Sequence, residues 1–409
     1  MLDYKSFIDL VKEKNLNYAA EQLNVSIAEA ELQAAKIFND PQLSLEYGDN
    51  EIANRNEDSK QMGRSVSVEL SKTFTVGKRG ANINLARSEK ELSEALLSDY
   101  FRNLLAEATL AYVDMLKQAE LYRVRENSCA NIRALAEADS IRLAHGDINE
   151  ADAMQSRIEA ESAANDLLQA RTDLANACAS LAVWTGSFVT EPAAMPSERL
   201  KSVRREFEAD FLLQSALANR ADLAAALKNS EVAARQLKVA QRERNTDFDL
   251  ALGYNYNTEV KNEIAPAPRF NGVTVGISVP LKFSNLNKGA VNAAKLRRQQ
   301  AETEYRQAEI EVQTQVMNAL RQYRSSVEQV NAYENGLHRK AEEVLKARIY
   351  SYQRGETSRS EVLIAQQTFD DLQSAYIEKV ADNVAALVDL ERNVGIWNIE
   401  NSLFHPAHN

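Results

Sequence analysis

The chain has 409 residues, and its 59 acidic and 48 basic side chains give a formal net charge of −11. This acidic balance disfavours nucleic acid as a partner. No run of 18 apolar residues occurs, so no transmembrane helix is expected. The first ten residues lack a basic start followed by an apolar core, so no signal peptide is expected within this sequence.

The first half of the chain alternates between helical and strand patterns. Residues 3–38 predict a helix that Pro41 ends. Alternating polar and apolar residues then predict strands over 41–48 and 64–74. A polar loop separates these strands, so the two form a hairpin. After a glycine-containing corner, a helical hairpin is predicted over 81–185, followed by a linker.

The second half repeats this order. A helix is predicted over 207–244, strands over 248–257 and 272–281, and a helical hairpin over 286–394 before a C-terminal tail. Residues 290–354 contain no proline and one glycine, so we expect a single helix of about 65 residues and roughly 100 Å. Its apolar residues step by four and three, as in a coiled-coil seam; they are Val312, Val316, Ala319, Tyr323, Val327 and Val330.

Each helical hairpin turns at a glycine. Gly146 and Gly355 suit the left-handed conformation that ends a helix. Asn149 stands where the first returning helix begins. Ser358, followed three residues later by Glu361, predicts a capping box at the start of the second.

The two halves match each other in order along the chain. Gly146 and Asn149 precede Gly355 and Ser358 by 209 residues. Strand residues match at an offset of 207; they are Val66, Val68 and Leu70 with Val273, Val275 and Ile277. Because strands and hairpin turns both match, we expect two structural repeats, 1–200 and 201–409.

The strands are the length of tilted membrane-spanning strands, about ten residues. A sheet in lipid must close, because an open edge leaves backbone groups unpaired. Four strands are too few to close alone, whereas three copies of the chain would supply 12. The sequence therefore predicts an oligomeric barrel continued by a helical cylinder.

The repeat, the paired hairpins and the glycine turns resemble the TolC-like outer-membrane efflux factors over nearly the whole chain. Two segments are most similar to the heavy-metal branch of CzcC- and CusC-like proteins; they are Leu70 to Arg79, and Val279-Pro280-Leu281 leading into Asn287-Lys288-Gly289-Ala290. The resemblance implies a mainly α fold with a small β part. Two repeated coiled-coil hairpins and four membrane strands per chain would form a trimeric 12-stranded β-barrel, continued by an α-helical periplasmic tunnel.

The resemblance also implies a place and partners. The protein would lie in the bacterial outer membrane, extend into the periplasm, and act with a periplasmic adaptor and an inner-membrane pump of the RND type. It would passively conduct heavy-metal cations or small toxic compounds. Two alternatives stay open, a channel for type I protein secretion and a coiled-coil scaffold that forms no channel. The N-terminal lipidated cysteine of many relatives is absent from this sequence.

The candidate functional residues lie near the hairpin turns. Some relatives place an acidic ring at the periplasmic mouth, at the position that matches Glu361, although the capping box alone also explains this residue. The channel-gate candidates are Glu361, Asp152, Arg354 and Arg359. The adaptor-contact candidates are Arg142, His145, Gly146, Asp147, Gly355 and Glu356. No zinc-spaced Cys and His cluster, phosphate loop or catalytic triad is recognised, so no enzyme, cofactor or metal site is expected.

Overall fold

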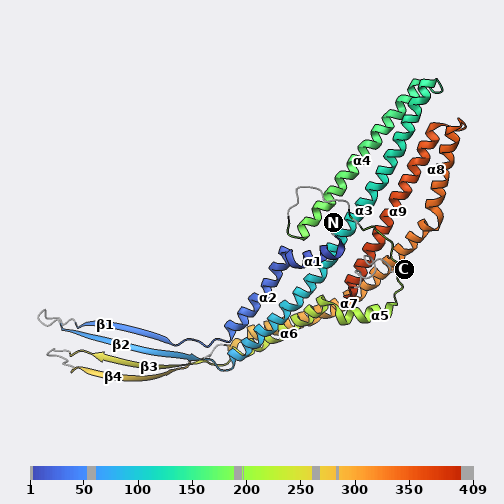
Figure 1. Cartoon of the computed structure of the whole chain (residues 1–409). Coiled ribbons are helices and arrows are strands. Elements are labelled where there is room, and N and C mark those ends of the chain that lie inside the picture. Colours follow the sequence, from blue (N-terminus) through green and yellow to red (C-terminus); the bar gives the residue numbers. More distant parts are fainter. Residues whose placement is uncertain are drawn as a thin grey trace. The chain divides into compact units, whose positions relative to one another are not determined.

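The structure is a computed structural model that describes residues 3–52, 61–187, 196, 198–259, 268–281 and 285–397. It is mainly helical with one small sheet (Figure 1). The elements of the first half are α1 (Tyr4–Lys14), α2 (Leu16–Ala35), β1 (Gln42–Ile52), β2 (Gln61–Phe74), α3 (Lys78–His145) and α4 (Glu150–Trp184). Those of the second half are α5 (Ala209–Asn219), α6 (Ala221–Arg242), β3 (Phe248–Asn257), β4 (Phe270–Ser278), η1 (Asn285–Asn287), α7 (Lys288–Ala332), η2 (Tyr333–Leu337), α8 (His338–Gln353) and α9 (Arg359–Val394). This order confirms the repeated arrangement of helices and strands.

The chain forms two compact units, and each unit draws on both halves of the sequence. The first unit comprises Met1–Leu23, Ala95–Ala224 and Gln307–Asn409. The second comprises Asn24–Glu94 and Ala225–Arg306. The hairpin turns therefore belong to the first unit, and all four strands belong to the second.

The sheet of the second unit is antiparallel, with the strand order β1-β2-β3-β4. Its register aligns apolar residues in rows across one face, such as the row Leu43, Leu70, Leu252 and Val275. These four side chains are between 48% and 78% exposed. In a water-soluble protein an apolar face of this kind packs against other parts of the chain, whereas here it is exposed within one chain.

The strand ends differ from the sequence prediction. β1 continues to Ile52 and β2 begins at Gln61, because backbone pairing extends past the apolar residues into the polar stretch. β4 covers Phe270–Ser278 instead of 272–281. Its pairing with β3 stops at Ser278, since Asp249 of β3 is the last partner and Pro280 has no N–H to donate.

Two helices that were predicted as continuous are broken, at Asn15 and at Arg220. Both residues have extended backbones, with φ and ψ of −66° and 118° and of −70° and 123°. Asn15 Nδ2 donates to the carbonyl of Trp184 at 3.0 Å, and Arg220 donates to the carbonyl of Asn393 at 3.3 Å. Since Trp184 and Asn393 are also 209 residues apart, each half makes the same contact between its first helical break and the end of its returning helix.

Glycines fit closely against these breaks. A Cβ on Gly186 would lie 2.5 Å from the carbonyl oxygen of Lys14, and one on Gly395 would lie 3.1 Å from that of Asn219. Both glycines have positive φ, 60° and 77°. A larger residue at either position would therefore meet both a backbone clash and a strained conformation.

The prediction of one continuous helix over 290–354 is wrong. α7 ends at Ala332, and a π-helical turn, η2, separates it from α8. Within this turn Gly336 has a φ of 116°, a backbone conformation that residues with a side chain rarely adopt. The regular α-helical hydrogen bonds are therefore interrupted here. The coiled-coil seam before the break is confirmed, because Val312, Val316 and Tyr323 are at most 2% exposed.

Candidate functional site at the hairpin tips

The two hairpins of the first unit end in turns of the same construction. In Figure 1, α4 runs back along α3, and α9 runs back along α8. Gly146 and Gly355 have φ values of 79° and 74°. The residues after them, Asp147 and Glu356, donate their backbone N–H groups to carbonyls five residues earlier at 2.9 Å in both turns. These bonds satisfy carbonyls at the helix ends, as expected for a glycine-terminated helix.

The returning helices also begin alike. The side chain of Asn149 accepts a hydrogen bond from the backbone of Asp152 at 2.8 Å, and that of Ser358 accepts one from Glu361 at 3.4 Å. The Ser358 half of the predicted capping box is confirmed. The Glu361 carboxylate instead binds Arg348 of α8 at 2.8 Å, together with the hydroxyl of Thr357.

A buried carboxylate, Asp139 of α3, lies at the centre of the tips and is 0% exposed. Tyr352 of α8 donates its hydroxyl to Asp139 at 2.6 Å, and Ser156 of α4 donates at 2.5 Å. The guanidinium Nε of Arg359, from α9, forms an ion pair with it at 3.2 Å. One carboxylate thus binds side chains from the three other helices.

Arg359 completes this arrangement from the second hairpin. Its side chain is 10% exposed and also forms an ion pair with Glu159 of α4. It donates to the backbone carbonyl of Asp152 at 3.1 Å. Arg142 adds a second positive charge, 3.9 Å from Asp139 and 4.8 Å from the ring centroid of Tyr352. We call this set the tip cluster; it consists of Asp139, Arg142, Ser156, Glu159, Tyr352 and Arg359.

The hydroxyl of Tyr352 is held in its protonated form within the tip cluster. Burial, followed by the hydrogen bond to the carboxylate of Asp139, raises the pKa of Tyr352 to about 12. At neutral pH the phenol therefore keeps its proton and remains a donor to Asp139. Removing one partner from a buried, paired charge is more costly than removing an exposed one, so the tip cluster resists separation of the hairpins.

The other predicted residues lie on the surface of the turns. Arg354 pairs with Glu356 at 3.4 Å and donates to the Tyr350 hydroxyl at 2.9 Å. The side chains of Arg354 and Glu356 are 57% and 55% exposed, so this pair contributes little free energy. His145 and Asp147 are exposed, at the first turn. Of the predicted residues, Arg142 and Arg359 belong to the tip cluster, and Asp152 contacts it through the backbone carbonyl that accepts from Arg359.

Sequence reasoning missed Asp139, Ser156, Glu159 and Tyr352. A usable signal existed for Asp139, which follows Ile132 by one heptad and Ala136 by three residues along α3. A carboxylate in an apolar seam position is costly unless partners neutralise it. A second such residue, Asp370 of α9, is buried and accepts from Ser128 of α3 at 2.5 Å, and burial raises its pKa.

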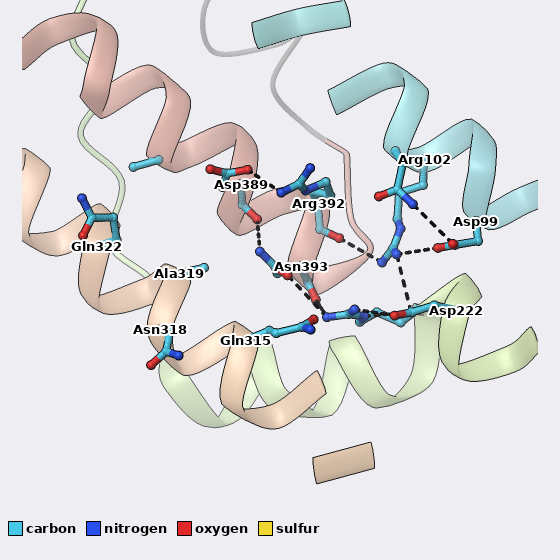
Figure 2. A pocket seen from close by; sticks show the side chains of 13 residues that line it. Asp99, Arg102, Asp222, Gln315, Asn318, Ala319, Gln322, Asp389, Arg392 and Asn393 are labelled. Carbon is cyan, nitrogen blue, oxygen red and sulfur yellow. Dashed lines mark hydrogen bonds and ion pairs between the residues drawn. The ribbon is translucent and has the colours of Figure 1, made fainter. Parts of the chain in front are cut away.

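A polar cavity of about 640 Å³ lies elsewhere in the first unit, between α3, α5–α6, α7 and α9 (Figure 2). Arg102 pairs with Asp99 at 2.6 Å and with Asp222 at 3.5 Å. Burial opposes ionisation of Asp222, but Arg220 at 2.5 Å and Arg102 outweigh it and lower its pKa. Arg102 also donates to the carbonyl of Arg392 at 3.1 Å. Three aspartates and three arginines line this cavity, so their formal charges balance.

A family model described as "Outer membrane efflux protein" matches residues 7–187 and 212–395. The chain belongs to the outer membrane efflux protein family. The predicted resemblance is thereby confirmed. Outer membrane efflux proteins are passive channels rather than enzymes, which confirms that this chain is not an enzyme.

Individual members of the family are similar along their length. The chain is 23% identical over 396 residues to the cobalt-zinc-cadmium resistance protein CzcC of Cupriavidus metallidurans, covering 96% of this chain and 90% of that protein. Its fold is similar to that of CusC, with a TM-score of 0.76, 18% identity, and coverage of 96% and 92%. The CmeC outer membrane channel of Campylobacter jejuni gives a TM-score of 0.77, 15% identity, and coverage of 96% and 85%.

Two further observations concern the described part of this efflux protein. None of its helices there combines the length and apolar character needed to cross a membrane. Among the same residues, no group of three or more His, Cys, Asp or Glu side chains is placed to hold a metal ion.

Proposed function

We propose that three copies of this chain form the outer-membrane exit duct of a tripartite efflux system, with a 12-stranded barrel continued by a periplasmic helical tunnel. One observation carries the proposal, the exposed apolar face of a sheet whose strands β1 and β4 each pair on one side only. Lipid covers that face, and copies of the chain satisfy the two open edges. A scaffold protein would gain nothing from either feature.

The experiment that tests this duct is a mass measurement in detergent. The exported protein should fractionate with the outer membrane and scatter light as three times the 45.7 kDa chain. It should also form channels in planar bilayers. A monomer that stays soluble without detergent would contradict the proposal.

The tip cluster closes the periplasmic end of the duct in this proposal. The contacts of the tip cluster support closure, because Arg359 and Tyr352 of the second hairpin bind Asp139 of the first, and Arg359 also binds Glu159. Opening then requires the second hairpin to move away from the first, and an adaptor that binds the turns can supply the energy. Glu361, already paired with Arg348, contributes to the charge at this mouth.

The turns themselves dock the adaptor. The contact candidates are His145, Gly146, Asp147, Gly355 and Glu356 on the surface of the turns, together with Arg142 of the tip cluster, and both glycines have open space around them. Gly146→Pro and Gly355→Pro should abolish efflux and leave the trimer intact, because the turns are remote in sequence from the strands. Wild-type efflux in both variants would exclude this role.

The cargo is heavy-metal cations or small toxic compounds, delivered by an RND-type pump. The similarity to a cobalt-zinc-cadmium resistance protein over 96% of the chain supports the metal assignment. Deleting the gene should lower the cobalt, zinc and cadmium concentrations that stop growth, and the wild-type gene should restore them. Unchanged metal tolerance with loss of a secreted protein would instead indicate type I secretion.

A further inference from the structure

A cavity of about 670 Å³ lies in the second compact unit, between the first turns of α3 and the last turns of α6. Nine described residues line it, and none is acidic. Three are basic, Arg235, Lys238 and Arg242, and three carry amide side chains, Asn84, Gln241 and Asn245. This composition contrasts with a chain whose net charge is −11.

The three basic side chains form no close ion pair with a carboxylate in the described part of the chain. Among the described residues, no ion pair within 4.0 Å involves Arg235, Lys238 or Arg242. The carboxylates on adjacent turns are held by other lysines. Lys78 binds Asp247 at 2.5 Å and Glu243 at 3.5 Å.

Glu91 is also held by another lysine. Lys228 binds it at 2.8 Å and lowers its pKa, with a smaller contribution from Arg235. The cavity therefore keeps a net positive charge.

The backbone adds to this charge. The cavity includes Gly77, Gly80 and Ala81, where the 68-residue helix α3 begins, and the first turn of α3 has no acidic residue. Its first N–H groups have no intrahelical partner and carry the positive end of the helix dipole. A Cβ on Gly80 would meet nothing within 4 Å, so there is room beside these donors.

We propose that this cavity binds a phosphate group. Two guanidinium groups can each bind phosphate oxygens with two parallel N–H donors, and an ammonium adds a third charge. Side-chain amides and the start of a helix supply neutral donors of the kind that surround phosphates in proteins. A carboxylate ligand would leave part of this donor set unused.

The position of the cavity indicates the source of the phosphate, and this step rests on the proposed membrane location of the sheet. β2 ends at Phe74, three residues before Gly77, and β3 begins at Phe248, three residues after Asn245. The rings of Phe74 and Phe248 stack at 5.3 Å, and the ammonium of Lys72 lies 5.9 Å from the Phe74 ring. Aromatic and lysine side chains of this kind lie at membrane surfaces, so an anionic phospholipid headgroup is the expected ligand.

Calorimetric titration of the purified full-length protein in a non-ionic detergent tests the site. The probes are inorganic phosphate, dihexanoyl phosphatidylglycerol and dihexanoyl phosphatidylcholine. Phosphatidylglycerol should bind more tightly than phosphatidylcholine. The triple variant Arg235→Gln, Lys238→Gln, Arg242→Gln should weaken that binding by about tenfold or more, since three charge-assisted contacts are lost. If the two lipids bind equally and inorganic phosphate binds tightly, free phosphate is the ligand of the same cavity.

A matched control removes the same charges from exposed positions of α7 in the same unit. It is Lys295→Gln, Arg297→Gln, Arg306→Gln, and it should bind both anions like the wild type. Lys238→Gln alone serves if the triple variant does not fold. The proposal is overturned if neither anion binds the wild type, or if both triple variants weaken binding equally. Channel formation is recorded on the same samples. Channels without anion binding reject only this site, whereas anion binding without channels rejects the proposed duct.

Discussion

The two helical hairpins share their turns and caps but differ in their outgoing arms. α3 runs without interruption for 68 residues, whereas the corresponding arm of the second hairpin is broken by η2 at Gly336. Glu334, in that turn, accepts from Ser202 at 3.1 Å and from Tyr376 at 3.0 Å, and it pairs with Arg204. The linker between the halves is thereby attached to the break. We therefore expect the outgoing arm of the first hairpin to be rigid and that of the second to bend at η2.

The largest expected effect comes from removing the carboxylate that joins the hairpins. Asp139→Ala should lower the free energy of unfolding by about 3–5 kcal/mol, because Arg359 and Arg142 lose a buried counter-charge. Single-channel conductance should rise as the second hairpin moves away. Thermal unfolding and planar-bilayer recording measure these two changes. Asp147→Ala, at the exposed turn of the same hairpin, is the control, and an equal effect of both variants would contradict a special role for Asp139.

The next effect separates two arginines that lie five residues apart. Arg359→Ala should increase conductance, since a side chain that is 10% exposed loses Asp139 and Glu159 together. Arg354→Ala removes only exposed contacts, with Glu356 and with the Tyr350 hydroxyl, and should change stability by about 0–1 kcal/mol, with little effect on conductance. Arg359→Lys should rescue part of the closure. Indistinguishable conductance traces from the two alanine variants would show that burial of the pair is irrelevant.

A smaller effect tests the break itself. Gly336→Ala should cost about 1–2 kcal/mol, because a Cβ disfavours positive φ even though nothing lies within 4 Å of it. Asn127, in α3, stands 209 residues before Gly336, so Asn127→Gly places a glycine at the matching point of the first hairpin. This change should cost less than about 1 kcal/mol. Denaturant unfolding compares them, and a larger loss in Asn127→Gly would reverse the assignment of rigid and bending arms.

The smallest expected effect is a pH dependence of stability that arises from Asp370. Burial raises the pKa of this carboxyl group, and it outweighs the hydrogen bonds from Ser128 and Gln366, which lower the pKa. A carboxyl group of this kind stabilises the fold most when protonated, below its ordinary pKa of 3.8. That contribution is lost as pH rises through 3.8 towards the raised value. The free energy of unfolding of Asp370→Asn minus that of the wild type should therefore be more positive at pH 7 than at pH 4. Unfolding curves at both pH values check this, and a constant difference would show that Asp370 does not titrate between them.

The sequence predicted the features that depend on neighbours along the chain. Gly146, Gly355, Asn149 and Ser358 act within one turn, so their spacing was sufficient to place both hairpin ends. The strands were found because alternation is local, although their ends were wrong where pairing extended beyond the apolar residues.

The features that sequence reasoning missed depend on contacts between distant segments. The tip cluster joins Asp139 to Tyr352 across 213 residues, and no local pattern states which faces of two hairpins meet. The breaks at Asn15 and Arg220 escaped notice because neither residue is a glycine or proline, and each break is stabilised by a carbonyl from the far end of its own half. Gly336 stands out in the sequence, but one glycine within a long apolar seam does not by itself predict a break in the helix.

The paired contacts of Asn15 with Trp184 and of Arg220 with Asn393 have a consequence for the integrity of the chain. Within each half, a hydrogen bond joins the first helical break to the end of the last helix, and neither bond depends on the linker between the halves. A proteolytic cut between residues 187 and 198 would leave both of these hydrogen bonds within single pieces. Two polypeptides made from separate genes would contain the same two hydrogen-bonding pairs as the intact protein.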